Sequence, residues 1–132
     1  MIELQVGVKI LLANAQGKYL LMRRSPIKYP ETQKWDIPSG RIDPGSTLMD
    51  NLAREVREET GLAIIGTPRL IAAQDILKNP ERHVVRLTYV GSTEGEPVLS
   101  EEHTEYGWYT VSEMTALDSL DSFVKKIIVD IS

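Results

Sequence analysis

The chain has 132 residues, of which 42% are hydrophobic and 26% charged, a composition typical of one soluble globular domain and not of a disordered chain. It contains no cysteine, which excludes a disulfide framework, a cysteine-ligated metal site and a thiol nucleophile. Fifteen Lys and Arg against 19 Asp and Glu give a formal net charge of −4, which argues against broad binding to duplex nucleic acid. The start lacks the basic region of a signal peptide, and no apolar run is long enough to span a membrane. We therefore expect a single cytoplasmic domain over residues 1–132 with no membrane partner.

Short runs of aliphatic and β-branched residues, separated by turn residues, predict several strands. In chain order these are residues 6–13, 18–23, 35–37, 63–65, 70–76, 83–90 and 106–109. The first two runs flank Asn-Ala-Gln-Gly at residues 14–17, whose turn chemistry predicts a hairpin. Surface loops are expected where prolines, glycines and polar residues replace a hydrophobic period, at residues 24–34, 41–45 and 91–104.

Residues 47–60 predict the longest helix, because apolar residues recur there at intervals of four, at Leu48, Leu52 and Val56. Ser46 is the predicted N-cap of this helix. Gly61 lies where a left-handed C-terminal cap belongs.

Two helical pieces are expected near the carboxyl terminus. Thr110 and Glu113 have the spacing of a capping box for a short helical turn. The apolar residues of the final segment share one helical stripe: Leu120, Phe123, Val124, Ile127, Ile128 and Ile131. We expect this stripe to pack on the sheet, with a second copy of the chain, in a homodimer, as the alternative partner for part of it. The order of elements predicts an α/β fold in which helices cover the faces of a mixed sheet.

Three carboxylates gather at the end of the predicted long helix. At 3.6 residues per turn, Glu55, Glu58 and Glu59 lie within an arc of roughly 100°. Like charges at this spacing oppose the helix by about 0.2–0.5 kcal/mol per pair, and carboxylates at a helix C-terminus also face the unfavourable end of its dipole. An arrangement that opposes the helix in two ways suggests a function for these side chains.

The position of Glu59 is the most informative, because the helical wheel places it between Leu48 and Leu52. A carboxylate at the edge of an apolar stripe needs a compensating cation. Neighbouring arginines, among them Arg54, could supply part of that charge, and a divalent metal such as Mg²⁺ is the other candidate. A salt-bridged acidic helix end without chemistry, in which Arg54 pairs with Glu58, is the alternative that these residues alone leave open.

Residues 40–62 resemble the signature of the Nudix hydrolase family, which runs Gly, five residues, Glu, seven residues, then Arg-Glu-apolar-any-Glu-Glu-any-Gly-apolar. The residues that match are Gly40, Arg54, Glu55, Val56, Glu58, Glu59, Gly61 and Leu62. At roughly 7% per residue type, six specific matches arise by chance about once in 10⁷ starting positions. One position departs from the pattern, since its first glutamate is Ser46 here. Looser resemblance extends through residues 20–24, 35–38 and 101–108.

The resemblance implies a Nudix-type α/β/α sandwich and a site that holds Mg²⁺ or Mn²⁺. Glu55, Glu58 and Glu59 would ligate the metal, the backbone carbonyl of Gly40 would add a ligand, and Arg54 would orient the cluster by ion pairing. These residues carry the expected catalytic role together with a carboxylate outside the signature. Our candidate for that carboxylate is Glu102, with Glu101 and Glu105 as substitutes and a solvated loop charge as the alternative reading.

Candidate substrate contacts lie near the first long loop. Arg23 and Arg24 leave a strand beside it, so either could hold a phosphate, with solvated strand-end charges as the alternative. Tyr29 and Trp35 are candidates to stack on a base, and core packing is the alternative for Trp35. His103 is expected on the surface of a polar loop, with a phosphate contact as the alternative.

The implied reaction is the attack of water on a phosphorus of a P–O–P linkage, in a nucleoside diphosphate linked to another group. The first candidate is MutT-like cleavage of a nucleoside triphosphate to a monophosphate and pyrophosphate. ADP-ribose, sugar nucleotides and dinucleoside polyphosphates stay open as substrates. The alternative from another class is a nucleotide-sensing module without turnover, which Ser46 favours and the intact carboxylates oppose.

Overall fold

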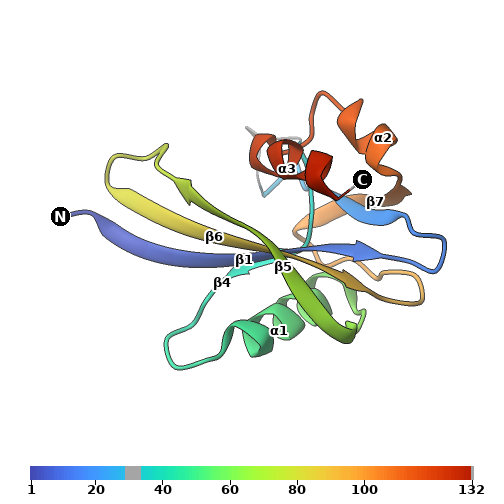
Figure 1. The fold of residues 1–132 in the computed structure, drawn as a ribbon, viewed down its shortest axis with the longest axis horizontal. Helices are drawn as coiled ribbons and strands as arrows, with labels where there is room; N and C mark the ends of the chain where they lie inside the picture. The colour runs from blue at the N-terminus through green and yellow to red at the C-terminus, as the bar shows by residue number, and fades with distance from the viewer. Residues whose placement is uncertain (29–33, 132) are drawn as a thin grey trace.

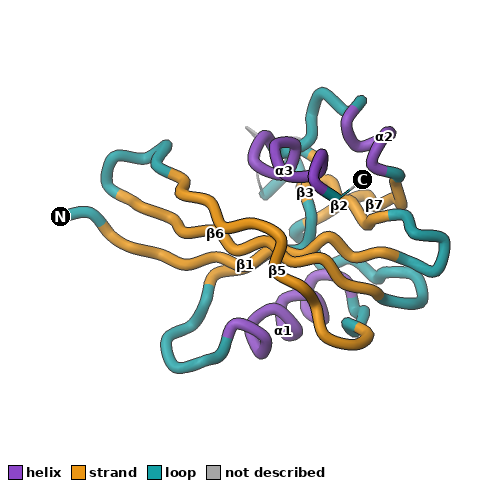
Figure 2. The backbone as a smooth tube through the Cα atoms, in the orientation of Figure 1, coloured by secondary structure: helices purple, strands orange, loops and turns teal. Residues whose placement is uncertain are grey.

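The strands of the protein form one curled, mixed sheet with β1 and β6 at its middle (Figures 1 and 2). The computed structural model describes residues 1–28 and 34–131. The strands are β1 (Glu3–Ala13), β2 (Tyr19–Arg24), β3 (Trp35–Asp36), β4 (Ser39–Arg41), β5 (Ile65–Ile76), β6 (Arg82–Ser92) and β7 (His103–Tyr109). β1 pairs in parallel with β6 along its whole length and antiparallel with β2 and β4. β5 adds to the outer edge of β6, while β3 and β7 add to β2.

Helices cover both faces of this sheet (Figure 1). Helix α1 (Leu48–Thr60) lies on one face, and α2 (Val111–Thr115), α3 (Ser122–Ile127) and the 3₁₀ turn η1 (Ile128–Asp130) lie on the other. The predicted α/β class, with helices on both faces of a mixed sheet, is thereby confirmed. Among the described residues, no helix combines the length and the apolar character that crossing a bilayer requires.

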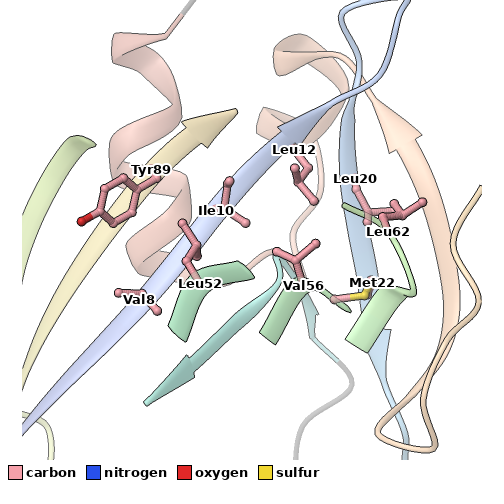
Figure 3. Packing of buried hydrophobic residues seen from close by; sticks show 9 residues of the cluster. All are labelled: Val8, Ile10, Leu12, Leu20, Met22, Leu52, Val56, Leu62 and Tyr89. Carbon is pink, nitrogen blue, oxygen red and sulfur yellow. The ribbon is translucent and has the colours of Figure 1, made fainter. Parts of the chain in front are cut away.

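The alternation of side chains along β1 divides the apolar residues into two cores. Val8, Ile10 and Leu12 face α1, where they meet side chains of β2, β6 and α1 (Figure 3). Leu11 points to the opposite face of the sheet, into the second core. This second core consists of Leu11, Leu21, Ile37, Met114, Leu120, Val124 and Ile128. Trp35 of β3 packs against the second core, and Ile42, directly after β4, packs against the first.

The predicted hairpin between β1 and β2 is confirmed. The Asn14 side chain accepts hydrogen bonds from the backbone N–H groups of Gln16, at 3.1 Å, and Lys18, at 2.9 Å. Gly17 has a φ of 75°, which a residue without Cβ adopts freely. The strand that follows is one residue later than predicted.

Three predictions about the strands were wrong in detail. The two strands predicted at 63–65 and 70–76 are one strand, β5, which begins only at Ile65 and continues through the expected break, because Gly66, with φ of 72°, permits an irregular register there. Ser39–Arg41 forms the short strand β4 on β1, where we had expected the end of a strand and the start of a loop. The loop at 91–104 is shorter, because β7 begins at His103.

The N-cap of α1 is Thr47 and not Ser46. The Thr47 side chain accepts a hydrogen bond from the backbone N–H of Asp50 at 3.1 Å, and its extended backbone begins the helix one residue later than predicted. Gly61 caps the other end with φ of 70°, as expected. The buried face is also rotated from the prediction, because Leu48 is exposed and Asn51 is fully buried.

The carboxyl-terminal segment is less helical than its apolar stripe suggests. The capping box at Thr110 and Glu113 is present. The predicted helix over 120–131 is instead α3 followed by η1, because the Asp121 carboxylate caps the N–H groups of Phe123 and Val124 and so fixes the start. Phe123 is only partly buried, so the stripe packs on the sheet through its other members.

Candidate active site

One cleft of about 460 Å³ gathers acidic side chains from separate parts of the chain. Glu55 and Glu59 reach it from α1, and Glu102 from the turn before β7. The remaining lining residues are Arg24, Asp36, Ser39, Gly40, Arg41 and His103. The structure thus brings together two of the three predicted helix carboxylates, the predicted outside carboxylate and the predicted glycine.

Glu59 is the most deeply buried of the helix carboxylates in the cleft, at 8% exposure. Its Oε1 accepts a hydrogen bond from the backbone N–H of Ser39 at 3.1 Å. The pKa of Glu59 is raised to about 8, first by burial, which the Ser39 N–H opposes and to which the nearby charges of Glu55, Glu102 and Asp36 add. Ionising Glu59 therefore costs free energy, and a cation bound in the cleft would offset this cost.

Glu55 packs against the backbone of β4, and its side chain is 18% exposed. Burial raises its pKa, the hydrogen bond from Arg54 opposes this, and the charges of Glu58 and Glu102 add to the rise. A Cβ on Gly40 would overlap the Glu55 side chain. Only glycine leaves room at position 40 for the helix carboxylate to lie directly on the strand.

Glu58 lies to one side of this cleft. Its side chain is 61% exposed and its Oε1 is 3.8 Å from Arg54 Nε. It lines an adjoining hollow of about 220 Å³ together with Glu55, Glu59 and Glu102. The three helix carboxylates therefore all line this adjoining hollow, and Glu58 is the most exposed of them.

Arg54 organises the helix carboxylates from the side. Its guanidinium donates to Asn51 Oδ1 at 2.9 Å and pairs with Asp43 at 2.9 Å and Glu55 at 3.3 Å. Asn51 also accepts from the Asp43 backbone N–H at 3.1 Å and donates to the Thr47 carbonyl at 2.8 Å. The expected orienting role of Arg54 thus has supports that the sequence analysis missed, since nothing in the pattern distinguished Asn51 from a solvated helix residue.

A buried ion pair underlies the other wall of the cleft. Lys9 Nζ lies 2.8 Å from both carboxylate oxygens of Asp36, and Arg24 reaches the same carboxylate at 3.2 Å. Sequence analysis missed this pair as well. The available signal was a single lysine inside an apolar strand, because a buried charge requires a partner.

The other predicted contacts separate into those near the cleft and those away from it. Arg24 lines the cleft, whereas Arg23 pairs with Glu105 at 3.4 Å outside it. Trp35 lies in the second core, edge-on to Tyr109 at 5.7 Å between ring centres, so the packing alternative is the one the structure shows. Tyr29 lies outside the described residues.

His103 was expected on the surface, and the structure corrects this. It is the first residue of β7 and lines the cleft, where burial lowers its pKa. Its Nδ1 is buried and has no hydrogen-bond partner among the described residues. Of the carboxylates near it, Glu102 is partly buried, whereas Glu101 and Glu105 are exposed.

The donor set suits a hard divalent cation, because such ions take carboxylate and carbonyl oxygens. Glu55 and Glu59, with Gly40 beside them, are the groups that would hold Mg²⁺ or Mn²⁺. The pKa of each carboxylate is raised mainly by burial, with neighbouring negative charges adding to the rise, and a cation would offset both effects. In residues 1–28 and 34–131, no three Asp, Glu or His side chains already surround one point.

Comparison with known proteins identifies the family, since the NUDIX domain matches residues 3–131. The chain belongs to the Nudix family. Its structure is similar to that of the MutT protein from Methanosarcina mazei Go1, with a TM-score of 0.86 and 27% identity over 98% of this chain and 93% of that one. The MutT NUDIX hydrolase from Burkholderia pseudomallei has the same fold, with a TM-score of 0.83 and 22% identity over 98% of this chain and 99% of that one.

Curated relatives with named activities are similar over part of their length. An RNA pyrophosphohydrolase from Psychrobacter cryohalolentis is 38% identical over 82 residues, which are 61% of this chain and 44% of that protein. The asymmetrical bis(5'-nucleosyl)-tetraphosphatase of Mus musculus is 33% identical over 109 residues, 79% of this chain and 71% of that protein. The chain thus spans less than half the length of the first of these relatives. The Nudix resemblance and the Nudix-type α/β/α fold predicted from the sequence are confirmed.

Proposed function

We propose that this Nudix protein is a pyrophosphohydrolase that cleaves a P–O–P bond in a nucleoside diphosphate linked to another group. The observation that carries this proposal is the convergence of Glu55, Glu59 and Glu102 in one open cleft, against a strand backbone that Gly40 leaves clear. Arg24 stands in the same cleft and supplies positive charge for a phosphate.

In the proposed reaction, the oxygen of a water molecule bonds to one phosphorus, the bridging P–O bond breaks, and the water proton passes to a base. Glu102 is the proposed base, because it lies in the cleft but is less buried than Glu59. Arg54 holds Glu55 in place through its ion pair. A divalent cation supplies, when bound, charge neutralisation of the diphosphate and of the leaving oxygen.

The first candidate substrate is a nucleoside triphosphate, cut to a monophosphate and pyrophosphate. Related proteins are named as an RNA pyrophosphohydrolase and as a bis(5'-nucleosyl)-tetraphosphatase, and both names indicate a nucleotide phosphoanhydride as the bond that is cut. In this proposal the acidic cleft binds the phosphoanhydride, and it does not bind the base or the sugar.

A turnover screen with Mg²⁺ tests the proposal. The panel contains nucleoside triphosphates, including oxidised ones, sugar nucleotides, ADP-ribose and dinucleoside polyphosphates, with products separated by chromatography. We expect wild type to cleave one class and Glu55→Gln to lose at least about 100-fold in rate, since a metal ligand supplies several kcal/mol at the transition state.

The matched control is Glu94→Gln, because Glu94 is an exposed carboxylate outside the cleft and should leave the rate unchanged. Tight binding of one compound without cleavage of any would contradict the proposal and support the sensing alternative.

A further inference from the structure

A second hollow, of about 260 Å³, adjoins the acidic cleft across strand β4. The two share Arg24 and the backbone of Ser39–Arg41, so one ligand can occupy both. Where the acidic cleft gathers carboxylates, this hollow is lined by positive side chains from β1, β2, β4 and β6. Apart from Arg24, its positive side chains have no part in the reaction proposed above.

Three residues form a row across the floor of the hollow. Gly7 of β1 is in register with Arg41 of β4 on one side and with Arg86 of β6 on the other. Paired residues in a sheet point to the same face, and neighbouring strands lie about 4.8 Å apart. The two arginines therefore stand about 10 Å apart at their Cα atoms with no side chain between them. We call this row the arginine subsite.

Neither backbone nor packing explains the glycine in this row. Gly7 is not among the glycines with positive φ, and a Cβ at this position would meet only the carbonyl oxygen of Gly40, at an ordinary 3.6 Å. Glycine inside a strand weakens it, and one such glycine often marks a close approach of a ligand. The missing side chain leaves an open floor between two guanidinium groups.

The charges of the hollow favour an anion. Four cationic side chains line it, Lys9, Arg24, Arg41 and Arg86. They face two carboxylates, since Asp36 pairs with Lys9 and Arg24, and Asp121 pairs with Arg86 at 3.3 Å. Two positive charges are thus in excess, in a chain whose net charge is −4.

The two arginines of the row differ in their contacts. Arg86 is 17% exposed and is held by Asp121 and by the Phe123 ring, 5.3 Å from its guanidinium carbon. The exposed Arg41 side chain makes no hydrogen bond or ion pair with any residue in the described part of the chain. The guanidinium of Arg86 is held in place and that of Arg41 has no described partner, so a phosphate between them would be contacted from two sides.

We infer that the arginine subsite binds a phosphate group of the substrate that is separate from the diphosphate being cleaved. The inference rests on the proposed function, because the diphosphate must lie in the acidic cleft for the substrate to cross β4. The substrate class is a nucleotide with an additional phosphate beyond the scissile bond. That phosphate belongs either to a longer polyphosphate chain or to the 3'-position of the nucleoside, and both present the same dianionic group.

Two variants test the subsite in different ways. Arg41→Gln removes a charge that has no other described partner, and Gly7→Val fills the floor without removing any charge. Arg69→Gln is the matched control, because Arg69 is an exposed arginine on β5 outside the hollow. Circular dichroism and thermal unfolding establish that each variant is folded.

Binding of inorganic tripolyphosphate, measured by calorimetry in EDTA, is independent of turnover. We expect its Kd to rise about 10- to 100-fold in Arg41→Gln, because a charge-assisted hydrogen bond is lost, and to rise in Gly7→Val, because the new side chain occupies the floor between the two arginines. The Kd should stay constant in Arg69→Gln. Equal Kd values in all four proteins would overturn the inference.

Kinetics with three substrates then identify the source of the phosphate. They are ADP-ribose, which lacks an additional phosphate, diadenosine tetraphosphate, and ADP-ribose carrying a 3'-phosphate on its adenosine. We expect both variants to raise KM for one of the phosphate-bearing substrates and to leave ADP-ribose unchanged. An equal loss for all three would overturn the inference, because Arg41 would then bind the scissile diphosphate itself. If wild type cleaves nothing, the proposed function fails, while the tripolyphosphate titration still decides the subsite.

Discussion

Replacing Glu59 by Gln should make the metal-free protein more stable at pH 8, although it removes a residue of the candidate active site. Burial raises the pKa of Glu59 from its ordinary 4.5 to about 8 in the folded protein. Below about pH 4.5 the carboxyl is neutral in both the folded and the unfolded chain, so burial of its charge costs nothing there. Between these values the unfolded chain releases its proton while the folded protein keeps it, so stability falls as the pH rises.

The size of this loss follows from the same two pKa values. Each pH unit between about 4.5 and 8 lowers the free energy of unfolding by about 1.4 kcal/mol. Above pH 8 the loss levels off at about 5 kcal/mol, as an order of magnitude, because Glu59 is then ionised in both states. Glutamine has no charge to bury, and its Oε1 can still accept the Ser39 N–H.

Urea unfolding in EDTA between pH 5 and pH 8 measures this difference directly. The advantage of Glu59→Gln over wild type should grow steadily with pH to several kcal/mol, whereas Glu58→Gln, whose side chain is 61% exposed, should show no comparable trend. A constant difference between the Glu59→Gln and wild-type curves would refute the reasoning, because the buried charge would then not be the cause. Adding Mg²⁺ at pH 8 should stabilise wild type and leave Glu59→Gln nearly unchanged.

Other contacts give predictions of their own. Gly40→Ala should fold but lose about 100-fold in turnover, because the new Cβ displaces the carboxylate that lies on it; near-normal kcat would contradict this. Lys9→Met should lower the free energy of unfolding by about 3–5 kcal/mol by leaving Asp36 buried without its lysine, and a loss below about 1 kcal/mol would show that Arg24 suffices. Thr47→Ala should cost about 1 kcal/mol as the loss of a helix cap, and Ser46→Ala almost nothing, with equal losses in urea unfolding counting against the assigned cap.

The helix and the two cores were largely predictable because their signals are local. Leu52 and Val56 repeat at the helical period, and Gly61 caps the helix as its position suggested. The cap at Thr47 was missed because Ser46 and Thr47 are adjacent residues of equal capping ability, and only the chain entering from Asp43 decides between them.

The site was predictable where a short segment carries it and unpredictable where distant segments meet. The helix carboxylates and Gly40 lie within one signature of 23 residues, from 40 to 62. The Lys9–Asp36 pair joins residues 27 positions apart, and the row through Gly7 joins three strands whose register no sequence pattern specifies. His103 was misplaced for the same reason, because its burial depends on the pairing of β7 with β2.

The most direct test of the account is the Mg²⁺ dependence of phosphoanhydride cleavage by wild type and by Glu59→Gln. With the substrate class found in the screen, wild type should release two phosphorylated products in Mg²⁺ and none in EDTA. Glu59→Gln should be slower by about 100-fold or more in Mg²⁺. Equal rates for the two proteins, or cleavage that persists in EDTA, would contradict the claim that these buried carboxylates perform the hydrolysis with a divalent cation.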